Sequence, residues 1–140
     1  MLSIISLMKT YSPQGVYFNE NGVCEYGYVY TLKGKNFIVC LYAIRVNGMW
    51  MGTYDYLCPM FGSAHPLIEG CEESFPTLRS LVENLWSYVV EGVVSGFKYS
   101  PMGYGELVIS AVKKASSEML SATDEDILKC FTSKSFFGYE

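Results

Sequence analysis

The chain has 140 residues and a net charge of −4, and it is 16% aromatic but only 17% charged. A typical globular domain carries about 25% charged residues, so this sequence is poor in charge, while its aromatic content excludes intrinsic disorder. No apolar run approaches the roughly 18 residues that a membrane-spanning helix needs. The length suits a single domain over residues 1–140 that can bury a substantial core.

Residues 2–57 predict an antiparallel β-meander of about four to five strands. The β-prone runs are residues 2–8, 16–18, 23–32, 37–46 and 49–57. Asn47-Gly48 is the strongest hairpin signal, because both central residues of a type I′ turn need positive φ. The first part of the chain is therefore predicted to form a β-sheet.

The second part of the chain predicts two or three helices, over residues 77–95, 105–120 and 124–131. The first has an apolar stripe at helical spacing, a good N-cap at Thr77 and a stop at Gly96. The last begins after Thr123 with three acidic residues, which favour the positive end of the helix dipole. The expected fold class is α+β, with the helices packed on the sheet.

The turns assign each strand residue to a face of the sheet. Two-residue loops at 47–48 and 34–35 place Arg45 opposite Trp50 and Tyr30 opposite Val39, and side chains alternate along each strand. One face is largely aliphatic and is predicted to be the floor for the helices; it holds Val29, Thr31, Ile38, Cys40, Tyr42, Ile44, Val46, Met49 and Met51. The other face, called the tyrosine face here, holds Tyr26, Tyr28, Tyr30, Leu41, Arg45, Trp50, Tyr54 and Tyr56.

The tyrosine face is the candidate binding surface. Tyr, Trp and Arg are enriched at binding hot spots because they offer large contact areas with polar tips. The expected partner-binding residues are Tyr26, Tyr28, Tyr30, Arg45, Trp50, Tyr54 and Tyr56. The alternative is that a helix or the N-terminal strand covers this face, or that its residues form ordinary cross-strand pairs.

Few residues point to catalysis or metal binding. His65 is the single histidine, and its spacing from Cys58 and Cys71 does not match a zinc knuckle. Cys58 or Cys71 with His65 as a thiol nucleophile lacks an orienting partner. The five cysteines are an odd number without repeated spacing, which favours free thiols in a reducing cytosol. We therefore expect a cytoplasmic protein that is not an enzyme and binds neither metal nor cofactor.

Residues 48–86 resemble small accessory proteins encoded by phages and plasmids. The motifs that carry this resemblance are Gly48-Met49-Trp50, Tyr54-Asp55-Tyr56, Gly62-Ser63, Pro66 and Phe75-Pro76-Thr77. The chain departs from the pattern in having one Gly-Ser step and a proline before the cap. The resemblance implies a mobile-element origin, in a group that includes inhibitors of host defence such as anti-CRISPR proteins.

These observations lead to one functional expectation and several alternatives. The expectation is a non-enzymatic protein that binds and inhibits a host protein or complex through the tyrosine face. The acidic excess of residues 57–140 could face a basic partner, although acidic helices are often only solvated surface. The alternatives are a single-stranded nucleic-acid-binding module, which the scarcity of basic residues disfavours, a homodimer with a structural aromatic face, and an enzyme using Cys58 or His65.

Overall fold

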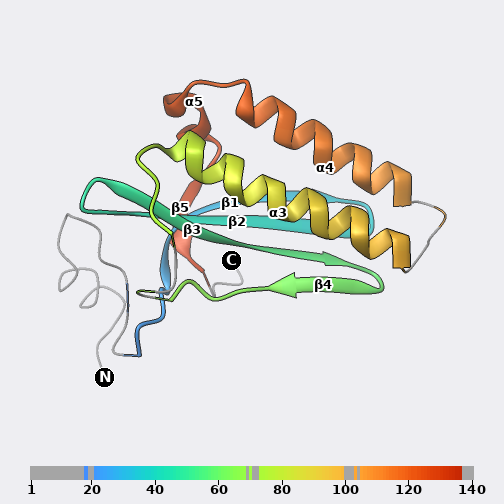
Figure 1. Cartoon of the computed structure of the whole chain (residues 1–140), viewed down its shortest axis with the longest axis horizontal. Coiled ribbons are helices and arrows are strands. Elements are labelled where there is room, and N and C mark those ends of the chain that lie inside the picture. Colours follow the sequence, from blue (N-terminus) through green and yellow to red (C-terminus); the bar gives the residue numbers. More distant parts are fainter. Residues whose placement is uncertain are drawn as a thin grey trace.

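A five-stranded antiparallel sheet forms the centre of the fold, and helices follow it in the chain, so the α+β fold class is confirmed. The computed structural model describes residues 18, 21–68, 70, 73–99, 103 and 105–136. The strands are β1 (Tyr26–Gly34), β2 (Phe37–Val46), β3 (Met49–Cys58), β4 (Phe61–Ala64) and β5 (Thr132–Ser135). Their order across the sheet is β4-β3-β2-β1-β5, so the last strand in the chain forms one edge beside the first (Figure 1).

The N-terminal strands of the meander differ from the expectation. The predicted strand 2–8 lies outside the described residues, and of the predicted strand 16–18 only Phe18 is described, in a single bridge with Cys24. The fourth and fifth strands come instead from β4, after residue 57, and from β5 near the end of the chain. β5 pairs with β1 from Tyr26 to Val29.

The predicted pairing is confirmed for one hairpin and shifted by two residues in the other. Arg45 lies opposite Trp50, as the Asn47-Gly48 turn predicts. In the β1–β2 hairpin the turn is one residue later than expected, with Asn36 at φ 69°, and Tyr30 therefore lies opposite Leu41 rather than Val39. Because side chains alternate with a period of two, this shift leaves every residue on its predicted face.

Three helices follow β4: α3 (Leu78–Tyr99), α4 (Gly105–Leu120) and α5 (Asp124–Lys129). The range of α4 is as predicted, and α5 begins after Thr123, whose hydroxyl accepts a hydrogen bond from the Asp126 N–H at 3.2 Å. The predicted stop of the first helix at Gly96 is wrong, because α3 continues to Tyr99. Gly96 is needed for packing instead: a Cβ there would lie 2.2 Å from the ring of Phe61.

The helices pack on the tyrosine face, which corrects the expectation that they would lie on the aliphatic face (Figure 1). Between the tyrosines, β2 contributes Val39, Leu41 and Ala43 to this face, and all three are buried. Gly52 pairs with Ala43, and a Cβ there would meet the main-chain oxygen of Tyr42 on β2 first and then, at 3.1 Å, a methyl carbon of Leu81 in α3. The tyrosine rings thus surround an aliphatic centre that matches the apolar stripe of the helix.

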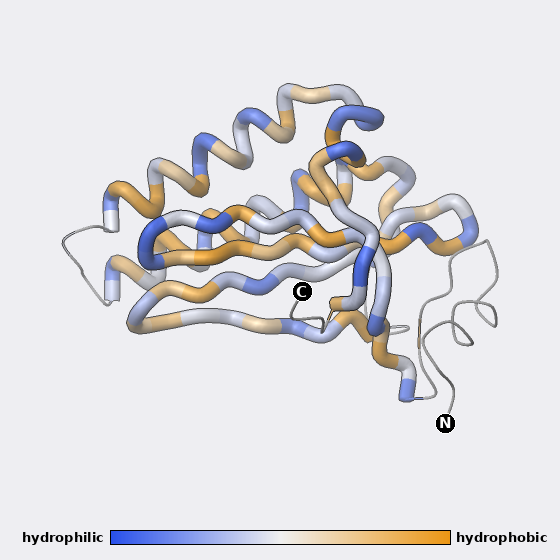
Figure 2. The backbone as a smooth tube through the Cα atoms, turned by 180° about the vertical axis from the view of Figure 1, so that it is seen from behind, coloured by the Kyte–Doolittle hydropathy of each residue, from blue (hydrophilic) through white to orange (hydrophobic). Residues whose placement is uncertain are grey.

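Among the described residues, segments outside α3, α4 and α5 cover part of the opposite face of the sheet. A second, smaller core of Phe18, Cys24, Ile44 and Leu67 lies there, with Phe136 packed against it. Figure 2 views the molecule from behind and shows the apolar colour along the central strands, with apolar and polar positions alternating along the helices. In the described part of the chain, no helix is both long and apolar enough to cross a membrane.

Candidate functional site

The tyrosine face packs against the protein's own core, and its predicted binding residues differ in burial: Trp50 is buried, Arg45 is exposed, and the tyrosines Tyr26, Tyr28, Tyr30, Tyr54 and Tyr56 are half-buried. Trp50 is 7% exposed, and the rings of Tyr28 and Tyr30 pack against the same core. Tyr30 contacts Trp86 of α3 edge-on, with 5.9 Å between ring centroids, and burial raises the pKa of its hydroxyl. The alternative stated above, that the chain's own helices cover this face, is confirmed for the sheet centre.

Trp50 has a structural role that its position in the hairpin did not reveal. Its main chain exchanges two hydrogen bonds of 2.7 Å with Phe75, which fixes the segment leading into α3 beside the part of β3 that β4 does not pair. Its ring is contacted by Tyr28, with 5.9 Å between centroids, and by the exposed guanidinium of Arg45 at 5.7 Å. Trp50 therefore connects the sheet to the segment that precedes α3.

Beside β4, residues of the tyrosine face stack with a partly exposed residue of α3. There Tyr54 lies nearly parallel to Tyr56, with 6.2 Å between centroids, and to Tyr88 of α3, with 5.9 Å. Tyr88 is 51% exposed. Two of the predicted binding residues, Tyr54 and Tyr56, thus join an aromatic stack that reaches solvent through a helical residue.

His65 completes this aromatic group from the chain just after β4. Its ring meets Tyr54 edge-on, with 4.9 Å between centroids and 81° between planes. Its Nε2 shares a hydrogen bond of 3.0 Å with the hydroxyl of Ser63. Burial raises the pKa of the Tyr56 hydroxyl, and a hydrogen bond with the same Ser63 offsets part of that rise. The ring of His65 is therefore held in place from two sides.

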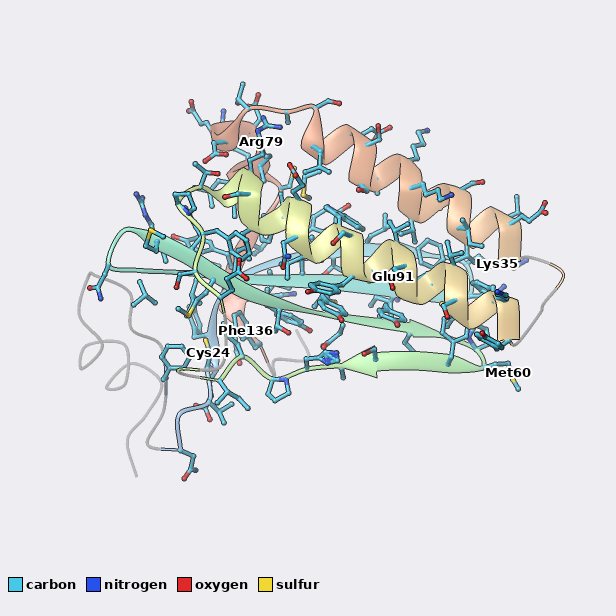
Figure 3. All side chains as sticks on the ribbon, in the orientation of Figure 1. Cys24, Lys35, Met60, Arg79, Glu91 and Phe136 are labelled. Carbon is cyan, nitrogen blue, oxygen red and sulfur yellow. The ribbon has the colours of Figure 1, made fainter. Side chains whose placement is uncertain are left out.

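These side chains line a cavity of about 270 Å³ between β3 and the first half of α3, which we call the tyrosine cavity. Its chemically distinctive residues are Tyr54, His65, Glu73, Phe75, Asn84 and Tyr88. The described residues that line it include no lysine or arginine, and Glu73 brings a carboxylate. The exposed Glu91 lies further along the same helix (Figure 3). The cavity combines aromatic walls with negative charge.

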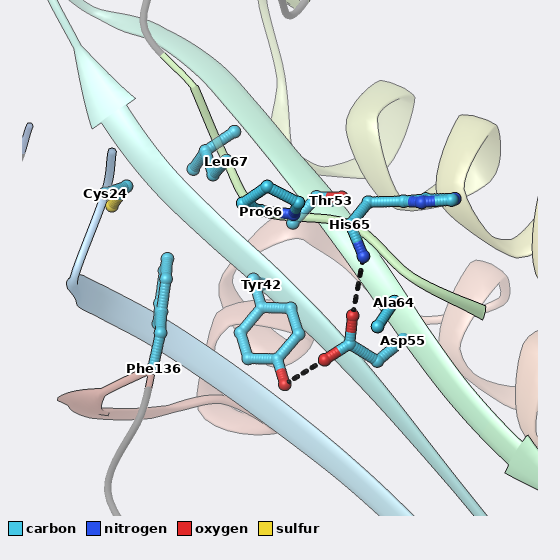
Figure 4. A pocket seen from close by; sticks show the side chains of 9 residues that line it. All are labelled: Cys24, Tyr42, Thr53, Asp55, Ala64, His65, Pro66, Leu67 and Phe136. Carbon is cyan, nitrogen blue, oxygen red and sulfur yellow. Dashed lines mark hydrogen bonds between the residues drawn. The ribbon is translucent and has the colours of Figure 1, made fainter. Parts of the chain in front are cut away.

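A second cavity, of about 240 Å³, lies on the opposite face of the sheet, and we call it the Asp55 cavity (Figure 4). The Asp55 carboxylate accepts hydrogen bonds from the Tyr42 hydroxyl at 2.7 Å and from the His65 main-chain N–H at 3.1 Å. Burial, followed by the hydrogen bond to Asp55, raises the pKa of Tyr42 above its usual value. Phe136 packs against the Tyr42 ring, with 4.8 Å between centroids.

Two of the free thiols, those of Cys24 and Cys58, are buried. Burial raises the pKa of Cys58, and it raises that of Cys24 to about 12, so both are protonated at neutral pH. The ring of His65 contacts Ser63 and Tyr54. Among the described residues no group of three His, Cys, Asp or Glu side chains is placed to hold a metal ion, and Cys71, of the zinc alternative, lies outside them.

Comparisons with protein-family models, with curated proteins and with solved structures find no match to this chain. Its function must therefore be argued from its own residues. Tyr88 and Asn84 were missed by the sequence reasoning, although one signal for Tyr88 existed. Tyr88 is a large aromatic residue beside the apolar stripe of α3 rather than within it, and such a residue is available for a contact outside the core.

Proposed function

We propose that this protein is an interaction protein that holds a basic side chain of a partner protein in the tyrosine cavity. The supporting observation is the combination of the stacked Tyr54 and Tyr88 rings with the carboxylate of Glu73 and no basic lining residue. A cation over the face of an aromatic ring gains about 0.5–1 kcal/mol at exposed sites and about 2 kcal/mol when it is desolvated. An arginine is the best match, because its planar guanidinium can stack on a ring and pair with a carboxylate.

The charge of the surroundings supports a basic partner. Glu83 and Glu91 are exposed on α3, and the chain as a whole carries a net charge of −4. Complementary charge increases association rates more than it increases affinity. A basic segment of a partner is therefore attracted to the same helix that presents Tyr88.

The nature of the partner rests on the resemblance of residues 48–86 to phage and plasmid accessory proteins. It suggests a host protein or complex, whose basic surface would be blocked when one of its side chains occupies the tyrosine cavity. Single-stranded nucleic acid suits the cavity less well, because its phosphates would meet Glu73 without a lining lysine or arginine. A homodimer formed by pairing of tyrosine faces would require a surface that the helices already cover.

The proposal is tested by selecting binders from a displayed library of random peptides on the wild-type protein. Enriched peptides should carry arginine or lysine at a fixed position. Their affinity should fall about five- to thirtyfold in Tyr88→Ala, as expected for loss of a contact of about 1–2 kcal/mol. Glu73→Gln should weaken binding by up to about fivefold, because exposed ion pairs contribute at most about 1 kcal/mol.

The matched control is Tyr99→Ala, on the same helix. Tyr99 is 77% exposed and does not line the cavity. This variant should bind the selected peptides like the wild type. Enrichment without a basic position, or an equal loss of binding in Tyr99→Ala and Tyr88→Ala, would contradict the proposal.

A further inference from the structure

The Asp55 cavity is a separate candidate site, on the sheet face opposite the one that packs against α3. Its walls are mainly apolar and include Phe136, Leu67, Pro66, Ala64 and the ring of Tyr42. Ala64, His65 and Pro66 are exposed, so the cavity opens to solvent along the end of β4. Figure 4 shows Asp55 beside Tyr42 and Ala64, with its carboxylate joined to Tyr42 and to the main chain of His65.

The carboxylate of Asp55 is held in a fixed orientation but is not saturated. One oxygen accepts from the Tyr42 hydroxyl and the other from the His65 N–H. An ionised carboxylate offers about four acceptor positions, so two donors leave room for a further one. Within the described chain, the ion pairs between side chains involve Glu118, Glu125 and Asp126 but not Asp55.

The size of the cavity limits the ligand. A volume of about 240 Å³ exceeds the roughly 150 Å³ that accommodates benzene in an engineered apolar cavity. It falls below the roughly 300–1,000 Å³ of pockets for drug-sized molecules. A ligand with one ring and a short polar arm fits these limits.

We propose that the Asp55 cavity binds a small amine, consisting of one apolar ring and a primary ammonium group that donates to the Asp55 carboxylate. The ring of such a ligand would lie against Phe136 and Tyr42, and the ammonium group would supply the cation that the carboxylate lacks among the described residues. The site does not depend on the proposed function, because its carboxylate and its walls differ from the aromatic and acidic groups of the tyrosine cavity.

The test is calorimetric titration of the full chain with 2-phenylethylamine, 2-phenylethanol and phenylacetate, which differ mainly in the charge of the polar arm. A hydrogen bond to a charged group contributes about 1.5–3 kcal/mol, so the amine should bind roughly ten- to a hundredfold more tightly than the alcohol. Phenylacetate should bind most weakly, since its charge repeats that of Asp55. Asp55→Asn should reduce the affinity for the amine to that for the alcohol.

A second variant tests the cavity without altering the carboxylate. Ala64 pairs with Asp55 across β3 and β4 and lines the cavity from an exposed edge position, so Ala64→Leu fills the site with little risk to the fold. This variant should weaken the amine and the alcohol alike, by tenfold or more. Tyr88→Ala is the control and should leave the affinity for the amine unchanged.

Three results would overturn the proposal: no saturable binding of the amine to the wild type, equal affinities for amine and alcohol, or amine binding that survives Ala64→Leu. Loss of amine binding in Tyr88→Ala would place the ligand in the tyrosine cavity and would overturn it as well. Because the peptide selection depends on Tyr88 and the titration on Ala64 and Asp55, either proposal can fail without the other.

Discussion

Replacing Gly96 by alanine tests how closely α3 lies on the β3–β4 hairpin. In an exposed helix interior this change stabilises by about 1 kcal/mol, because alanine has the higher helix propensity. Here the new Cβ would lie 2.2–2.5 Å from three ring carbons of Phe61, which itself meets Phe97 edge-on with 4.9 Å between centroids. Such overpacking costs about 1–3 kcal/mol, and an aromatic pair lost by rotation of the ring costs about 0.5–1.5 kcal/mol.

The packing cost should exceed the gain in helix propensity, so Gly96→Ala should lower the free energy of unfolding by about 1–2 kcal/mol. For a domain of this size that corresponds to a fall in Tm of about 3–10 °C, measured by circular dichroism. The decisive comparison is the same substitution in a Phe61→Ala background. There the clash is absent, and Gly96→Ala should stabilise by up to about 1 kcal/mol. Stabilisation in the wild-type background would refute the close approach of α3 to β4.

Two further predictions concern the core and the Asp55 cavity. In the core, Trp86 donates its indole N–H to the sulfur of Met119 at 3.2 Å. Met119→Leu conserves side-chain volume but removes this acceptor, so it should lower the free energy of unfolding in urea by about 1–2 kcal/mol. An unchanged stability would show that the buried N–H needs no acceptor. The folded protein raises the pKa of Tyr42, so above the usual tyrosine pKa of about 10 the unfolded chain releases a proton that the folded chain retains. Stability should therefore fall as the pH rises above about 10 and should fall less steeply in Tyr42→Phe; parallel profiles of stability against pH would contradict this assignment.

Local signals explain which parts of the fold the sequence predicts well. Asn47 and Gly48 both adopt the positive φ that their turn requires, 53° and 79°, and the strand pairing and face assignment of β2 and β3 follow from that turn. The predicted position of the β1–β2 turn was wrong, but each residue still lies on its predicted face, because a shift of two residues in the strand pairing preserves the alternation of side chains. The identity of the tyrosine face and the presence of Tyr54 and Tyr56 beside each other on it could therefore be read from the sequence.

Long-range packing explains what the sequence could not predict. Both faces of the sheet contain apolar residues, so composition does not tell which of them receives the helices. The choice depends on contacts between residues far apart in the sequence, such as those that α3 makes with β2 and β3 across the core. The tyrosine cavity has the same origin, since Tyr88 reaches Tyr54 only when α3 lies along β3, and so a binding surface expected on bare sheet becomes a cavity between sheet and helix.

The alternation of β3 also explains why two cavities with different chemistry lie back to back. Tyr54 and Asp55 are consecutive residues, and they point to opposite faces of the sheet. His65 repeats this arrangement within one residue, because its ring packs on Tyr54 while its main-chain N–H donates to Asp55 on the other side. One cavity is therefore built from aromatic rings of β3 and α3 with an acidic side chain from the segment before α3, and the other around the carboxylate of Asp55 in β3. Because every residue except proline keeps its main-chain N–H, a substitution of His65 would remove the ring contact with Tyr54 and leave the donor to Asp55 in place.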